Sequence, residues 1–107
     1  MKRLHVRWLE PASIDLIEVV EFVRKDRPAA ARKLGRELLR AASRLSRHPQ
    51  IGKIVPELQE QGMSDYRQVL ISSYRLIYAI RGQSIEVFAV IDGRRDLEAA
   101  LFQRLVR

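Results

Sequence analysis

The chain has 107 residues, 47% of them hydrophobic, and its 20 Lys and Arg against 13 Asp and Glu give a formal net charge of +7. This length predicts a single domain over residues 1–107, and the absence of cysteine excludes disulfides and thiolate metal sites. With no apolar run near the roughly 20 residues of a membrane span and no signal-peptide pattern, we expect a cytoplasmic protein. Its positive charge favours nucleic acid or an acidic protein as a partner, and solubility alone is the other interpretation of that charge.

The first half of the chain predicts one strand and two helices. Residues 4–9 alternate apolar and polar side chains, as a strand does. The pattern from Ser13 to Lys25 predicts a helix whose exposed side carries Asp15 and further acidic residues. A second helix is predicted from Pro28 to His48, antiparallel to the first because the link is short. Its buried stripe is expected to contain Ala31, Leu34, Leu38, Ala41 or Ala42, and Leu45.

Arginines recur along this second helix at strict four-residue intervals. Residues four apart lie on the same side of a helix, so the arginines should form a row on one exposed side. A solvated helix face is one interpretation, and a contact with phosphates or with an acidic protein is the other. The row consists of Arg32, Arg36, Arg40 and Arg44.

The second half of the chain predicts a loop, three strands and a helix. Residues 51–62 are expected to form a loop or an irregular extended segment, since they contain Pro56 and Gly62. Short β-branched and aromatic runs from residue 66 to residue 92 predict three consecutive strands, with turns at residues 72–73 and 81–84. The apolar residues of 94–107 mark a final amphipathic helix.

These turns predict the register of the three strands. Val69 should face Leu76, Tyr78 should face Val87, and Leu76 should face Ala89. One face of the sheet is then apolar and needs helices to cover it, whereas the other is mixed and partly open. The apolar face would include Ala89 and Ile91, and the mixed face would include Arg75, Phe88, Val90 and Asp92.

The element order β-α-α-β-β-β-α therefore predicts an α+β domain. Its small, mostly antiparallel sheet should carry a helical hairpin packed on one face. Neither of the two histidines has a partner at ligand spacing, and the five glycines are scattered, so we expect no metal site, no phosphate loop and no cofactor.

Four residues remain as candidates for a functional site. Glu57 is interpreted as a general base or as a loop carboxylate paired with an arginine. Arg75 either binds a phosphate or pairs across strands with Glu86 or Asp92. Arg94 and Arg95 open the final helix, where they either contact an anion or cap the helix with Asp92 and Asp96.

Several segments, in order along the chain, resemble the RelE/ParE superfamily of bacterial toxins from type II toxin–antitoxin systems. They are the helical hairpin, GKIVPEL at residues 52–58, YRLIYAI at residues 74–80 and VIDGRRD at residues 90–96. The resemblance covers nearly the whole chain. It implies an α+β toxin with one of two activities, which belong to the two branches of the superfamily.

The RelE-like branch cuts messenger RNA, usually on the ribosome. In several of these enzymes a glutamate follows the loop proline and an arginine lies in a Y/H-R-L-V-Y strand, and Glu57 and Arg75 match those two positions. The same enzymes often carry a Tyr or a His-Tyr near the C-terminal end. Here no His or Tyr follows Tyr78. The usual general acid is therefore missing, which argues on chemical grounds against RNA cleavage.

The ParE-like branch has the same fold as these nucleases but lacks their catalytic residues, and in that respect the chain resembles it. This resemblance implies a toxin without enzymatic activity that binds DNA gyrase. It also implies a cognate ParD-like antitoxin that neutralises the toxin through an acidic, disordered segment, and operator DNA that is bound only through the antitoxin. Arg75, Arg94 and Arg95 are the candidate target contacts, and the arginine row and the groove beside the hairpin are the candidate antitoxin contacts. The alternatives are a RelE-like ribosome-dependent mRNA endonuclease and an inactive member that only binds its antitoxin.

Overall fold

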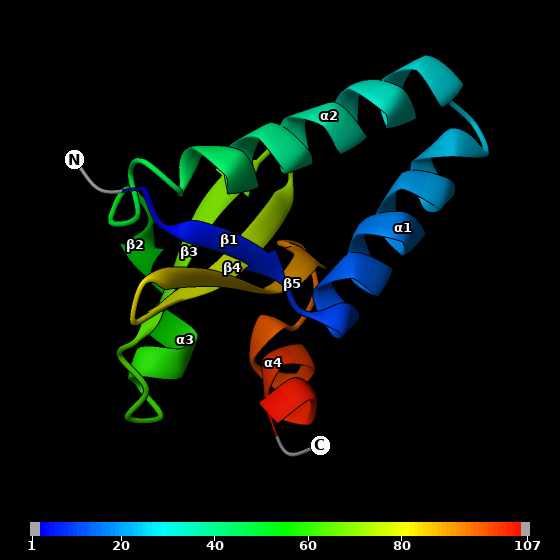
Figure 1. The fold of residues 1–107 in the computed structure, drawn as a ribbon. Helices are drawn as coiled ribbons and strands as arrows, with labels where there is room; N and C mark the ends of the chain where they lie inside the picture. Colours follow the sequence, from blue (N-terminus) through cyan, green and yellow to red (C-terminus); the bar gives the residue numbers. More distant parts are fainter. Residues whose placement is uncertain (1–2, 106–107) are drawn as a thin grey trace.

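A computed structural model describes residues 3–105, in which every element of the expected order forms and two short elements are added (Figure 1). The additional elements, β2 and α3, lie where a loop was predicted. The elements in chain order are β1 (His5–Trp8), α1 (Glu10–Arg24), α2 (Pro28–Arg44), β2 (Lys53–Ile54), α3 (Pro56–Gln59), β3 (Tyr66–Ile71), β4 (Tyr74–Arg81), β5 (Ser84–Asp92) and α4 (Leu97–Leu105).

Helices α1 and α2 form the predicted hairpin. Each has a proline in its first turn, where the missing N–H would have no partner inside the helix. The buried positions of α2 follow helical spacing and confirm the predicted stripe, with Ala42 rather than Ala41 buried. Helix α2 ends at Arg44, before the predicted end at His48, although Leu45 in the following turn is also buried.

The five strands form one mixed sheet in the order β1-β5-β4-β3-β2. Strand β1 is parallel to β5, and the remaining neighbours are antiparallel. The two-residue strand β2 pairs with β3 at the edge, and α3 begins directly after it at Pro56. A strand of two residues and a helix of four are too short to show a hydrophobic period, so the sequence predicted a loop there.

A β-bulge in β5 changes which side chains face the hairpin. Val69 pairs with Leu76 and Tyr78 pairs with Val87, as predicted. Beyond that point the predicted pairing of Leu76 with Ala89 is wrong. Leu76 pairs with Val90, and Ile77 pairs with Ala89, because Phe88 is an extra residue without a partner on β4.

The bulge divides the apolar residues of the sheet between two cores. The core under the hairpin contains Leu38, Leu76, Tyr78, Val87 and Val90, among others. On the opposite face a second core lies under α3 and α4 (Figure 1). Ala89 and Ile91, which were predicted to face the hairpin, belong to this second core, together with Val55, Leu58, Ile77, Leu97 and Leu101. The face that was expected to be partly open is therefore largely covered.

Candidate functional site

Glu57 and Arg75, the two residues that match nuclease positions, lie in contact with each other. Arg75 Nη1 donates to Glu57 Oε1 and Oε2 at 3.1 Å each, and to Gln68 Oε1 at 3.2 Å. Their side chains are partly buried, with 21% of Arg75 and 25% of Glu57 exposed. The interpretation of Glu57 as a carboxylate paired with an arginine is confirmed. In this arrangement both carboxylate oxygens of Glu57 accept hydrogen bonds from one guanidinium nitrogen of Arg75.

The suggested pairing of Arg75 across strands with Glu86 or Asp92 is wrong. Glu86 instead contacts Arg7 at 3.4 Å and Arg81 at 3.7 Å. Asp92 lies at the end of β5, where it pairs with a different arginine. Arg75 finds its partner in α3, an element that the sequence did not predict, because α3 packs over the sheet face from which Arg75 projects.

The end of β5 is held against the turn between β3 and β4. Gly93 N donates to Ser73 O at 2.7 Å, and a Cβ at Gly93 would lie 3.0 Å from that oxygen and 3.7 Å from Arg75 Nε. This close approach brings Arg75 near the segment that carries Arg94 and Arg95. The three candidate target contacts therefore lie at one end of the sheet.

Arg94 and Arg95 differ in what they contact. Arg94 pairs with Asp92 at 2.9 Å, and its backbone N–H also donates to Asp92 Oδ1 at 3.0 Å. This hydrogen bonding lowers the pKa of Asp92 and raises the pKa of Arg94. The pairing of Arg94 with Asp92 is thus confirmed, but α4 begins at Leu97 and not at Arg94 as predicted, so this pair lies before the helix and does not cap it. Arg95 is exposed and lines a groove, and Asp96 caps α4 through a 3.1 Å bond from Ala99 N.

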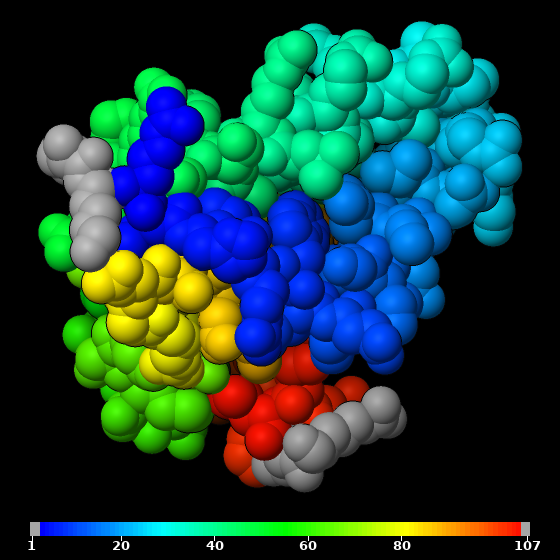
Figure 2. Space-filling view, viewed as in Figure 1, coloured from blue at the N-terminus to red at the C-terminus, as the bar shows by residue number. Residues whose placement is uncertain are grey.

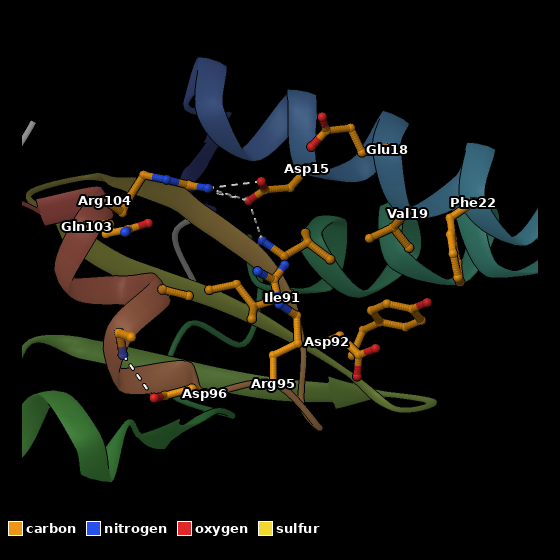
Figure 3. Close-up of a pocket in the computed structure, with 14 residues that line it drawn as sticks. Asp15, Glu18, Val19, Phe22, Ile91, Asp92, Arg95, Asp96, Gln103 and Arg104 are labelled. Atoms are coloured by element: carbon orange, nitrogen blue, oxygen red, sulfur yellow. Dashed lines mark hydrogen bonds and ion pairs between the residues drawn. The ribbon is translucent and has the colours of Figure 1, made fainter.

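This groove, with a volume of about 740 Å³, runs between α1, the end of β5 and α4 (Figure 3). Its α1 wall combines apolar and acidic side chains, including Val19, Glu18 and Phe22. Phe22 is 68% exposed although it is aromatic. The opposite wall carries Arg95, Asp96 and Gln103 (Figure 3). A groove with both apolar surface and charges of both signs suits a peptide segment of a protein partner.

Asp15 and Arg104 form the inner end of this groove. Arg104 Nη2 donates to Asp15 Oδ1 at 3.0 Å, and Val90 N of β5 donates to Asp15 Oδ2 at 3.0 Å (Figure 3). Arg104 Nη1 also donates to Phe88 O of β5 at 3.0 Å. The last strand pair of β1 is Trp8 with Val87. The ion pair thus satisfies the polar backbone groups of β5 where β1 leaves the sheet.

Sequence reasoning missed this ion pair. Asp15 was placed with Glu18 and Glu21 on an exposed acidic side, but its side chain is only 14% exposed. One signal in the sequence pointed to a partly buried Asp15. It precedes Val19, which packs against the core, by one helical turn, so the two lie on the same side of α1. Its partner Arg104 lies 89 positions away and could not have been chosen from among 20 Lys and Arg residues.

The arginine row lies apart from these residues, on the outer side of α2, which forms an outer edge of the molecule (Figure 2). All four side chains are exposed, as predicted. The candidate residues therefore fall into two groups, one at the end of the sheet and one on the hairpin. Among residues 3–105 no group of three or more His, Asp or Glu is arranged to hold a metal ion, and no helix there combines the length and apolar character of a membrane span.

Comparisons with known proteins were made on sequence and on structure. Residues 6–97 match the family model described as "ParE toxin of type II toxin-antitoxin system, parDE". No curated protein sequence matches the chain. A solved structure titled "Chromosomal ParDE TA system from P. aeruginosa" is similar in fold, with a TM-score of 0.69 and 14% identity over 84% of this chain and 96% of that chain.

Proposed function

The chain belongs to the ParE toxin family of type II toxin–antitoxin systems, and we propose that it is a toxin that binds and inhibits DNA gyrase and is neutralised by a ParD-like antitoxin. The observation that supports binding over catalysis is the contact between Glu57 and Arg75. A general base must be free to take a proton, and a phosphate-binding arginine must be free to take a phosphate. Here both carboxylate oxygens of Glu57 contact Arg75 Nη1, so the two groups are engaged with each other.

The residues that follow β5 support the same proposal. No His or Tyr follows Tyr78, and the segment after β5 carries Arg94 and Arg95 instead. Arg95 is exposed in the groove and makes no salt bridge among the described residues. We assign Arg95, with Arg94 and Arg75 beside it, to the contact with gyrase. Because gyrase acts on the bacterial chromosome, the proposal places the protein in the cytoplasm.

The antitoxin is proposed to occupy the groove between α1, β5 and α4, and to be attracted by the arginine row. A disordered segment that folds on binding must bury apolar surface to offset its loss of entropy. Exposed Phe22 and Val19 in the groove offer such surface, and the row attracts an acidic chain over a longer range. Charge reversal of Arg32, Arg36, Arg40 and Arg44 to Glu should weaken antitoxin binding and reduce its salt dependence. Unchanged affinity would remove the row from the contact.

The proposed target is tested by incubating the purified protein with gyrase and relaxed plasmid. We expect inhibited supercoiling or trapped, cleaved DNA, and a weaker effect for the Arg95→Gln variant. Arg7→Gln serves as the matched control, because Arg7 is also an exposed arginine but lies on β1, outside both groups of candidates. No effect on gyrase, combined with codon-linked cuts in translated messages by primer extension, would support the mRNA endonuclease instead. Neither activity would leave a protein that only binds its antitoxin.

A further inference from the structure

The outer side of α2 carries an unbalanced row of positive charge. Arg32, Arg36, Arg40 and Arg44 are exposed, and none of them takes part in a salt bridge among residues 3–105. Glu37 is the one acidic residue within Pro28–Arg44. The positive charge of the row is therefore available to a partner, and it is not used to hold the fold together.

The helix fixes the spacing of these arginines. With a rise of about 1.5 Å per residue, successive members of the row are about 6 Å apart along the axis, and the whole row spans about 18 Å. Each step of four residues also turns by about 40°, so the four side chains fan over about 120°. Such a row presents several cations to a stiff, extended polyanion lying across the helix, with Arg36 and Arg40 at its centre.

The composition of this face distinguishes between possible polyanions. Helix α2 contains no aromatic residue, whereas proteins that hold single-stranded nucleic acid stack the bases on aromatic side chains. An acidic protein segment that folds on binding needs apolar surface, which lies in the groove and not on the row, so the row can attract such a segment without burying it. Duplex DNA needs neither aromatic nor apolar surface, because its bases stay stacked on one another. It presents about one negative charge per 1.7 Å of axis.

We propose that the arginine row of α2 binds the phosphate backbone of duplex DNA without reading its sequence. This goes beyond the proposed contacts with gyrase and antitoxin, because the toxin would contribute a DNA contact of its own in place of reaching DNA only through its antitoxin. Four phosphate contacts give a slope of about −3.6 in log K against log salt. A fourfold rise in salt concentration should then weaken binding about 150-fold.

The test measures binding of the purified toxin alone to a labelled duplex of arbitrary sequence, by fluorescence anisotropy over a series of salt concentrations. Replacing all four row arginines with Gln should lower the affinity at low salt more than tenfold and bring the slope from about −3.6 close to zero. The matched control replaces Arg7, Arg24, Lys53 and Arg81 with Gln. These basic residues are also exposed and lie off α2, so the control removes the same charge and should retain the wild-type affinity within about threefold.

Three results would overturn the proposal: no binding of the wild type to duplex at low salt, an equal loss in both variants, or tighter binding to a single strand of the same length. An equal loss would mean that net charge alone attracts DNA. Glutamine is a good helix former and the row is exposed, so both variants should fold, which circular dichroism checks. Neither gyrase nor antitoxin is present in this assay. Its failure would therefore leave the proposed function standing, and failure of the gyrase assay would leave this proposal standing.

Discussion

Asp15 and Arg104, 89 positions apart in the chain, form an ion pair that fastens α4 to α1 and to the bulged end of β5. Arg104 bonds to both Asp15 carboxylate oxygens at 3.0 to 3.2 Å, and its guanidinium lies 5.9 Å from the centre of the Phe88 ring. Leu97 and Leu101 also hold this helix in the second core, and Ala100 and Leu105 pack against that core. The pair therefore connects the two walls of the proposed antitoxin groove.

Asp15→Asn should loosen α4. The substitution keeps the shape of the side chain but leaves Arg104, 23% exposed, without a counter-charge. We expect a loss of about 1–3 kcal/mol in the free energy of unfolding, measured with denaturant, and faster hydrogen exchange in α4. Glu21→Gln removes the exposed partner of Arg24 and serves as the control, with no measurable change. Unchanged exchange in α4 would mean that Leu97 and Leu101 hold the helix without the ion pair.

Tyr78→Phe should destabilise the core under the hairpin. The side chain of Tyr78 is fully buried, and its hydroxyl accepts from Gly52 N at 2.9 Å and donates to Pro49 O at 2.8 Å. Phenylalanine leaves that buried N–H and that carbonyl without this partner, so we expect a cost of about 1–3 kcal/mol. Tyr66→Phe, at a partly exposed hydroxyl 3.3 Å from Arg81, should cost much less in the same denaturant experiment. Equal costs would contradict a special role for the Tyr78 hydroxyl.

Gly52→Ala should also be destabilising, but for a steric reason. A Cβ at this position would lie 2.7 Å from Gln68 O and 2.7 Å from the Tyr78 hydroxyl oxygen. The backbone of Gln68 and the buried ring of Tyr78 cannot both move aside, so the loop that carries Gly52 must shift. We expect a loss of at least about 1–3 kcal/mol by thermal or chemical unfolding. Gly62→Ala has open space around it but a φ of +84°, so it tests backbone strain without a clash.

The stability of the protein should fall at alkaline pH because of Tyr78. Burial raises the pKa of Tyr78 above its usual value of about 10. Above pH 10 the unfolded chain therefore loses this proton while the folded protein keeps it. The resulting contribution to the free energy of unfolding is fully present below about pH 10 and is lost as pH rises towards the folded pKa. Denaturation series between about pH 8 and pH 11 should show this decline in the wild type and a smaller one in Tyr78→Phe. Identical slopes would refute the assignment.

Arg94→Gln should raise the pKa of Asp92. Hydrogen bonding to the Arg94 side chain and backbone lowers this pKa in the native protein. Glutamine removes the charged contact and keeps the backbone bond, so the pKa should move part of the way back to that of an ordinary aspartate. Carboxyl titration by NMR reads this directly, with Asp96 as an internal reference. No movement would mean that the backbone N–H of residue 94 alone lowers the pKa.

Local patterns in the sequence were sufficient to predict most of the fold. The period-two runs gave three strands with the correct turns, and the helical spacing from Ala31 to Leu45 gave the buried side of α2. The bulge escaped prediction because Phe88 and its neighbours are apolar, so either assignment of faces places them against a core. An extra residue in such a run leaves no trace in the hydrophobic pattern.

The candidate site was harder to predict, because its contacts join distant segments. Glu57 and Arg75 were both identified as candidates, but their contact depends on α3, which packs a four-residue helix against the sheet. The groove depends on where α4 lies relative to α1, and the link between them, Asp15 with Arg104, joins opposite ends of the chain. Tertiary packing decides such contacts, and no local period predicts them.

The parallel pairing of β1 with β5 has a consequence for the timing of synthesis. His5 lies beside Ser84, and Trp8 lies beside Val87. Of the five strands, β1 is therefore the first to leave the ribosome, and it cannot pair until β5, the last, has been made. The hairpin can form early, since its contacts are local. The groove, by contrast, closes only after Arg104 has emerged. A nascent chain therefore cannot display its completed groove to a partner until α4, with Arg104, has been translated.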